Sequence, residues 1–275
     1  MDRTQILDYL KDRPEALKKM ELMGPAGQVD ARGAKKMEEI AGFAAIILRY
    51  VREWIPDQDL TVLEGSCGKS YLGFVLALLF PEVDERPVRL RGVDSNPDLI
   101  ERCRTLAADL GLEHAQFVPS RTINFESEEQ FNLVVSLHAC DTATDEAIAR
   151  GIRFGSRLIL SVPCCQNQIR GQIKSGHPLT PMTDYGPARY RLANLLTDTL
   201  RAQFLNAAGY HVQLDEIGSP RLTPKNLCIC ARKVKRKSRT PRDVDYRRLR
   251  DMFEVRPKIE KLCPEVLDET VTDQQ

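Results

Sequence analysis

The chain has 275 residues, of which 42% are apolar and 29% charged, so it can bury a core and is not disordered throughout. Its 40 basic and 39 acidic residues nearly cancel, so no whole-molecule charge draws it to nucleic acid or to a membrane. The longest apolar run, residues 71–80, would rise about 15 Å as a helix, half of a bilayer core, so no membrane partner is expected.

The N-terminus carries charges where a secretory signal needs an apolar centre, so we expect a cytoplasmic protein. Eight cysteines are too few for a small secreted scaffold, and several lie in strand-like apolar runs, so we interpret them as reduced thiols. No Cys-x-x-Cys pair is present, which argues against a zinc ribbon or a thioredoxin-type centre.

Residues 1–58 are predicted to form a helical N-terminal segment. Apolar residues recur there at steps of three and four, and Gly24-Pro25-Ala26-Gly27 separates two such stretches. The pattern then changes to short apolar runs that alternate with longer amphipathic ones, as in strands and crossover helices around a parallel sheet.

This alternation predicts an α/β domain over residues 59–233. We expect parallel strands at 61–64, 88–94, 115–119, 131–137 and 157–162, and two closing strands at 210–217 and 227–231. We expect helices at 71–80, from Pro97 to a stop at Gly111, and at 189–208. Residues 166–190 form a long connection that is a candidate lid.

Residues 234–275 are predicted to be a charged tail. Between residues 231 and 250 there are ten Lys or Arg against two Asp, and from Glu265 onward only acids are charged. Such runs are usually solvated surface or disordered ends, and contact with RNA is the alternative.

The turn after the first strand reads Glu64-Gly65-Ser66-Cys67-Gly68-Lys69-Ser70, where backbone N–H groups and a helix start can meet an anionic group. A P-loop would need Gly at position 63, which is Leu, and the nicotinamide pattern Gly-x-Gly-x-x-Gly is absent. A second acid, Asp94, closes the next strand, and this pair suits an adenosine with a charged amino-acid tail.

These residues resemble the class I methyltransferases that use S-adenosyl-L-methionine, a Rossmann-like fold with a seven-stranded, mostly parallel sheet and helices on both faces. The resemblance implies that the strand-end acid and the glycine loop line the methionine part of the cofactor and that Asp94 holds its ribose. The residues assigned in this way to the cofactor are Glu64, Ser66, Cys67, Gly68, Asp94, Ser120 and Leu137.

One departure from the family pattern lies in the loop itself. The usual Gly-x-Gly-x-Gly appears as Ser66-Cys67-Gly68-Lys69-Ser70, with serine in place of both outer glycines. Serine can fit a tight turn, but glycine does so at less cost. The alternative to an enzyme is therefore a degenerate methyltransferase-fold binding module without turnover, which recruits RNA or a protein partner.

Three further patterns narrow the resemblance to the methyltransferase-domain-32 branch. They are Leu137-His138-Ala139-Cys140-Asp141-Thr142-Ala143-Thr144-Asp145, Val162-Pro163-Cys164-Cys165-Gln166 and Thr223-Pro224-Lys225-Asn226-Leu227. The first two are also similar to patterns in tRNA 2'-O-methyltransferases that carry a Cys-Cys motif. The third pattern could face the crevice at the carboxyl ends of the fourth and fifth strands, or it could be a plain turn.

The residues after the fourth and fifth strands are the catalytic candidates. His138 or Asp141 could remove a proton from a weakly acidic acceptor, although a histidine at a strand end is often structural. A thiolate of Cys164 or Cys165 could add to a pyrimidine ring, or the cysteines could be apolar fillers of the acceptor pocket. Asp145 could cap the following helix.

A metal site made of His138, Cys140, Cys164 and Cys165 has ligands that suit zinc, but the spacing matches no standard site, and no metal is predicted. The function expected from the sequence is methyl transfer from S-adenosyl-L-methionine to a macromolecule, with RNA favoured by the resemblance and by the basic segment 231–250. The oligomeric state is not predicted.

Overall fold

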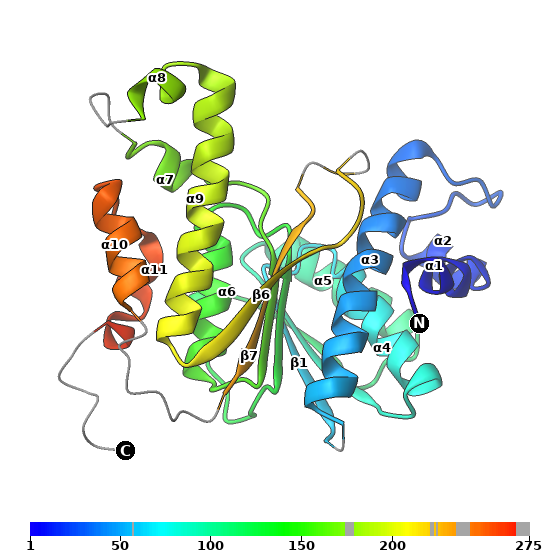
Figure 1. Ribbon diagram of the computed structural model, residues 1–275. Coiled ribbons are helices and arrows are strands. Elements are labelled where there is room, and N and C mark those ends of the chain that lie inside the picture. Colours follow the sequence, from blue (N-terminus) through cyan, green and yellow to red (C-terminus); the bar gives the residue numbers. More distant parts are fainter. Residues whose placement is uncertain (57, 174–178, 221–222, 224, 235–242, 268–275) are drawn as a thin grey trace.

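A computed structural model describes residues 1–56, 58–173, 179–220, 223, 225–234 and 243–267. Seven strands form one sheet in the order β3-β2-β1-β4-β5-β7-β6, with helices on both faces (Figure 1). The strands are β1 (Leu60–Gly65), β2 (Val88–Asp94), β3 (Ala115–Pro119), β4 (Leu133–Leu137), β5 (Leu158–Val162), β6 (Tyr210–Glu216) and β7 (Leu227–Lys233). The predicted fold class and its seven strands are confirmed.

The sheet reverses direction of growth between β1 and β4. From β1 the chain adds β2 and β3 on one side, and it then returns to add β4 and β5 on the other side of β1. All these strands pair in parallel, whereas β7 is antiparallel to both β5 and β6, as expected for a last strand. Open α/β sheets bind ligands at such a reversal, outside the carboxyl ends of the strands.

Alternate residues of the central strands enter two separate cores, one on each face of the sheet. Val135 and Leu160 belong to a core built with the N-terminal helices, α4 and α5, whereas Val134 and Ile159 belong to one built with α6, α9 and the C-terminal helices. The first set is α1 (Arg3–Lys11), α2 (Pro14–Lys19), α3 (Ala31–Trp54), α4 (Tyr71–Val83) and α5 (Pro97–Asp109). The second set includes α6 (Thr142–Arg153), α9 (Gly186–Ala207), α10 (Val244–Met252) and α11 (Lys258–Leu262).

The N-terminal segment is helical, as predicted, and it covers one face of the sheet. The Asp30 carboxylate caps α3 by accepting a hydrogen bond of 2.6 Å from the Gly33 N–H, which satisfies a free donor of the first turn. From Met37 to Val51 most side chains of α3 are buried and share one core with β1, β2 and β5. The segment is therefore part of the same packed body. In the described residues no helix is both long and apolar enough to cross a membrane.

The connection predicted as a lid contains two short helices, α7 (Asn167–Arg170) and α8 (Thr180–Thr183), and the long helix α9 already begins at Gly186. Pro187 at the start of α9 fixes a helical φ without losing a backbone hydrogen bond, which explains the earlier start. The predicted start of α5 at Pro97 is confirmed. The Asn96 side chain caps this helix by accepting hydrogen bonds from the Asp98 and Leu99 N–H groups.

The interpretation of the tail as solvated or disordered is wrong for residues 243–267. Helices α10 and α11 and the short 3-10 turn η2 (Pro264–Val266) lie against α9 and α6, and Tyr246, Val255 and Ile259 are fully buried. The prediction considered only the number of charged residues and overlooked the few apolar residues of this segment, which are buried. The basic segment 231–250 lies partly outside the described residues, at 235–242.

Candidate functional site

The loop between β1 and α4 adopts the backbone conformation of a glycine loop without its outer glycines. Ser66, Gly68 and Ser70 have φ of 52°, 55° and 50°, so every second residue is left-handed. A non-glycine residue pays about 1–2 kcal/mol for this conformation. The turn is held by Cys67 N–H to the Val93 carbonyl (3.0 Å) and Ser66 N–H to Thr122 Oγ1 (3.0 Å).

Glu64 anchors this loop from below. Its carboxylate is buried and accepts a hydrogen bond from the Ser70 hydroxyl at the start of α4. Gly73 permits this approach, because a Cβ there would lie 2.5 Å from Glu64 Oε2. Burial raises the pKa of Glu64 to about 7, and the Asp94 charge adds to the rise, against the hydrogen bonds from Ser70 and Gly73. The assignment of Glu64 to the methionine part of the cofactor stays a prediction.

Asp94 joins the ends of β1 and β2. One carboxylate oxygen accepts from the Gly68 N–H and the other from the Asn96 N–H, both at 2.9 Å. The Asp94 carbonyl accepts from the Ser120 N–H at 2.9 Å, which brings the end of β3 to the same place. The predicted residues Ser66, Gly68, Asp94 and Ser120 are thus brought together by direct or shared contacts.

A second group of side chains lies at the ends of β4 and β5, where Leu137 pairs with Val162. His138 follows Leu137 with a left-handed φ of 58° and donates its N–H to the Val162 carbonyl at 2.9 Å. This unusual conformation turns the chain sharply at the sheet edge. His138 Nε2 lies 3.2 Å from the Glu39 carboxylate of α3.

Glu39 is a site residue that the sequence analysis missed. It is buried on α3, where it contacts both His138 and Lys36 Nζ (2.9 Å). Burial acts to raise the pKa of Glu39, but hydrogen bonds from His138 and Lys36 outweigh it and lower the pKa to about 2. The available signal was a carboxylate inside the buried run of an otherwise apolar helix face.

The Glu39 contact fixes the proton arrangement of His138. A carboxylate can only accept, so Nε2 carries the hydrogen, and in the neutral form of the ring the lone pair lies on Nδ1. Nδ1 is buried and has no hydrogen-bond partner within the described part of the chain. Such a pair, in which a carboxylate orients an imidazole, leaves the second ring nitrogen as an acceptor.

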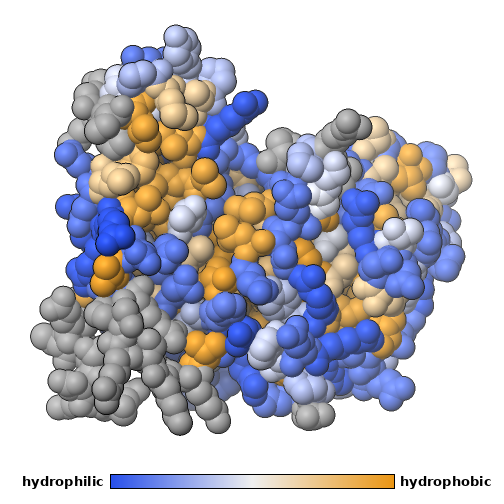
Figure 2. Space-filling model, viewed as in Figure 1, coloured by the Kyte–Doolittle hydropathy of each residue, from blue (hydrophilic) through white to orange (hydrophobic). Residues whose placement is uncertain are grey.

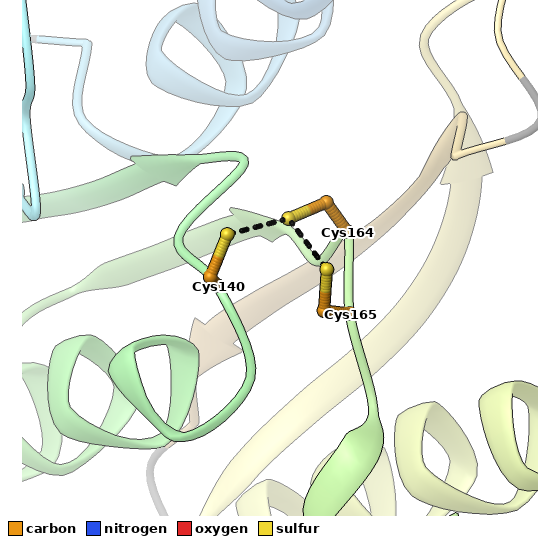
Figure 3. A group of neighbouring side chains, drawn as sticks. All are labelled: Cys140, Cys164 and Cys165. Carbon is orange, nitrogen blue, oxygen red and sulfur yellow. Dashed lines mark hydrogen bonds between the residues drawn. The ribbon is translucent and has the colours of Figure 1, made fainter.

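Cys164 and Cys165 follow β5, and their thiols lie beside that of Cys140, which follows β4 (Figure 3). Burial raises the pKa of the Cys164 thiol, and the neighbouring thiols of Cys140 and Cys165 add to the rise. A lone Cys164 thiolate is therefore disfavoured at neutral pH, which weakens the idea of its addition to a pyrimidine ring.

Asp141 is turned toward the backbone of α7. Its carboxylate accepts from the Gln168 N–H at 3.1 Å, and its carbonyl accepts from Arg201 at 2.7 Å. The prediction that Asp145 caps α6 is wrong, because Arg201 binds this carboxylate through two nitrogens, at 3.0 and 3.1 Å. Arg201 is nearly fully buried, and a buried charge of this kind requires such partners.

The third sequence pattern joins the second. Gln166 is buried, its amide NH₂ donates to the Asp198 carboxylate (3.1 Å), and its amide oxygen accepts from Lys225 Nζ (3.1 Å). Lys225 therefore faces the β5 end, as one of the two sequence interpretations proposed. Thr223 and Asn226 are buried beside it, whereas Pro224 lies outside the described residues.

The strand order and the loops that meet at the carboxyl ends of β1, β2 and β4 define a Rossmann-like methyltransferase fold. The chain belongs to the methyltransferase domain family, which matches residues 35–172. This match includes most of α3 with Glu39, the loop between β1 and α4, and the ends of β4 and β5. S-adenosyl-L-methionine, the predicted cofactor, is confirmed by this membership. The finer likeness to tRNA 2'-O-methyltransferases stays a prediction.

Curated relatives share only modest identity. A Xenopus laevis glutathione S-transferase C-terminal domain-containing protein is 22% identical over 147 residues, which are 54% of this chain and 22% of that protein. The Homo sapiens protein of the same name is 24% identical over 192 residues, with 61% and 29% covered. The chain thus spans less than a third of the length of these relatives.

Solved structures that resemble this fold have lower sequence identity to the chain than the curated relatives do. An rRNA methylase from Streptococcus thermophilus has a TM-score of 0.47 and 10% identity, and the match covers 70% of this chain and 96% of that chain. The magnesium protoporphyrin IX methyltransferase of Synechocystis PCC 6803, solved with bound S-adenosylmethionine, has a TM-score of 0.45 and 13% identity, with 85% and 98% covered.

Proposed function

We propose that the protein is an active methyltransferase that transfers a methyl group from S-adenosyl-L-methionine to RNA. The observation that carries the proposal is the pairing of an intact donor loop with an oriented histidine at the neighbouring strand end. Asp94 holds the Gly68 N–H at one side of the sheet reversal, and Glu39 holds His138 at the other. Gly68 and His138 follow β1 and β4, the two paired strands between which the order reverses.

The residues of the donor side fit the cofactor by their chemistry. The Asp94 carboxylate has no cationic partner in the described chain and keeps lone pairs that suit the two ribose hydroxyls. The left-handed turn at Ser66, Gly68 and Ser70 turns the backbone at the carboxyl end of β1 and leads into α4. Bound here, S-adenosyl-L-methionine supplies a methyl group on a positively charged sulfur.

On the acceptor side, His138 is the proposed base and Glu39 its positioning residue. Methyl transfer needs donor and acceptor in line, and an acceptor hydroxyl or amine must also lose a proton. Nδ1 is buried, so acceptor binding must first expose it. His138 Nδ1 then takes that proton, and the Glu39 carboxylate stabilises the resulting imidazolium through Nε2. Asp141 is engaged with α7 and Arg201, so it shapes the strand end and is the weaker candidate for the base.

RNA as the acceptor is supported by a surface above the β5 end. Met182, Tyr185, Tyr190 and Leu195 of the α8–α9 region are exposed, and Figure 2 shows apolar residues gathered over upper α9. The cationic groups of Arg170 and Lys225 lie 5.8 and 4.7 Å from the Tyr190 ring centre. Aromatic rings beside cations are the elements that bind unpaired bases and phosphates of single-stranded RNA.

Isotope-labelled donor incubated with total RNA, protein and small-metabolite fractions tests this proposal. Label in RNA supports it, and label confined to protein rejects the RNA acceptor. The double variant Tyr185→Ala with Tyr190→Ala should lose RNA labelling while donor affinity is unchanged, because neither side chain belongs to the donor loop. The Asp94→Ala variant should abolish donor binding in calorimetry, and unchanged affinity would remove the ribose assignment.

The alternative, a binding module without turnover, is favoured by one observation, the two serines in left-handed positions of the donor loop. It expects donor binding without label in any fraction. Label from the parent protein therefore separates the two proposals, and the His138→Asn variant of an active enzyme should then abolish labelling and leave donor affinity unchanged.

A further inference from the structure

Three thiols converge at the carboxyl ends of the neighbouring strands β4 and β5. Cys140 lies three residues after the end of β4, and Cys164 and Cys165 lie just after the end of β5, so the pairing of β4 with β5 brings them together. The Cys140 and Cys164 sulfurs are 3.4 Å apart, and the Cys164 and Cys165 sulfurs are 3.7 Å apart. All three sulfurs lie within 4.8 Å of one another, and Figure 3 shows the side chains turned toward Cys164.

These separations match the edges of a tetrahedral metal site. Zinc binds thiolates at about 2.3 Å, so two sulfurs on one tetrahedral zinc lie about 3.8 Å apart. The two shorter sulfur distances, 3.4 and 3.7 Å, are within about half an ångström of that edge. Small rotations of the side chains therefore complete a three-thiolate site without movement of the backbone.

The fourth position of this site is open. No fourth Cys, His, Asp or Glu of the described residues joins the group, and His138 is directed by Nε2 to Glu39. Cys140 is exposed, so one side of the cluster faces solvent. Three protein ligands with one open position are the arrangement of catalytic zinc, whereas structural zinc has four.

We propose that Cys140, Cys164 and Cys165 bind one Zn²⁺ as three thiolates, with the fourth coordination position open toward solvent at the carboxyl ends of β4 and β5. The spacing in the sequence, one cysteine followed 24 residues later by an adjacent pair, matches no standard motif, and only the strand pairing assembles it. The inference concerns metal binding alone and does not depend on methyl transfer.

Binding follows a simple proton balance. Three neutral thiols release three protons as they become thiolates on the metal, and no oxidant or reductant is required. The thiols of Cys140 and Cys164 approach the His138 carbonyl at 3.8 and 3.4 Å. The metal must displace these weak contacts, and its affinity should fall as the pH falls.

The test uses the full chain, kept reduced and titrated with Zn²⁺ under competition with a chromogenic chelator. We expect one zinc per chain, measured by elemental mass spectrometry. Titration with Co²⁺ should give the charge-transfer absorption of cobalt thiolates, which a site made only of oxygen and nitrogen ligands lacks. The Cys140→Ser variant should weaken zinc binding by about 100-fold or more, since even loss of an outer partner costs about 10–100-fold.

Two variants serve as controls for this experiment. Cys140 is exposed, so Cys140→Ser should melt at the temperature of the parent protein, and the loss of zinc then reports a lost ligand. Cys263→Ala removes a buried thiol that contacts the Ala149 carbonyl in the core built with α6 and α9. This variant should keep one zinc per chain.

Three results would overturn the proposal. The first is a reduced parent protein that holds no zinc against the chelator. The second is a Cys140→Ser variant that binds zinc as tightly as the parent. The third is a Cys140–Cys164 disulfide that persists under reduction. Donor binding is measured separately by calorimetry, so failure here is distinguishable from failure of the methyltransferase proposal.

Discussion

Replacing Glu39 by Gln tests whether α3 supplies a working part of the site. The carboxylate pKa falls from 4.5 to about 2 in the folded protein, through hydrogen bonds from His138 and Lys36 that outweigh burial. At about 1.4 kcal/mol for each pKa unit, the charge contributes about 3 kcal/mol at neutral pH. Gln keeps the shape of Glu and can still accept from Nε2, so about 3 kcal/mol is an upper bound on the loss.

The sign of the pH dependence follows from a depressed pKa. The stabilisation is fully present above pH 4.5 and is lost as the pH falls toward 2, because the folded protein then binds the proton that the unfolded chain already holds. The difference between parent and Glu39→Gln in urea unfolding should therefore be largest at pH 7 and shrink below pH 4.5. A difference that is constant with pH, or absent at pH 7, would refute the reasoning.

The adjacent Glu38 provides the matched control. Its carboxylate lies 3.4 Å from Arg3 at a partly exposed position, and such pairs contribute about 0–1 kcal/mol. Glu38→Gln should thus change stability little at any pH. In the methylation assay, Glu39→Gln should lower kcat and leave donor affinity unchanged, a split that a purely structural role does not produce.

Three further outcomes are expected from the donor loop and are measured by urea unfolding. Ser66→Gly should stabilise the protein by about 1 kcal/mol, because glycine removes the left-handed strain and keeps the N–H bond to Thr122. Ser70→Ala should instead destabilise it by about 1–2 kcal/mol, because the left-handed strain stays and the buried Glu64 carboxylate loses its hydroxyl partner. Burial raises the pKa of Glu64 to about 7, so Glu64→Gln should gain stability relative to the parent as the pH rises from 5 to 8; a gain on acidification would contradict this.

The sequence was sufficient for the strands and for most helices because local patterns determine them. Runs rich in Val, Leu and Ile marked β4 and β5, and the Asn96-Pro97 start and Gly111 stop marked α5. The turn between β1 and α4 was also predictable, since its residues lie within one strand, turn and helix. Its left-handed serines were recognised by position, although the hydrogen bonds that hold them were not.

The missed features depend on contacts between residues far apart in the chain. Glu39 and His138 are 99 positions apart, and nothing in either local pattern joins them. The convergence of the Cys140 and Cys164 thiols, by contrast, was one of the sequence alternatives, because it needs only that β4 and β5 are neighbours. The tail was misjudged because its charges outnumber the few apolar residues that bury α10 and α11.

Helix α3 covers a core and, within the same buried run, reaches His138 through Glu39. Replacing α3 by another amphipathic helix could preserve the packing on the sheet. Without Glu39, however, nothing would hold the hydrogen of His138 on Nε2. Positions 39 and 138 are therefore coupled, and a variant library should randomise both positions together.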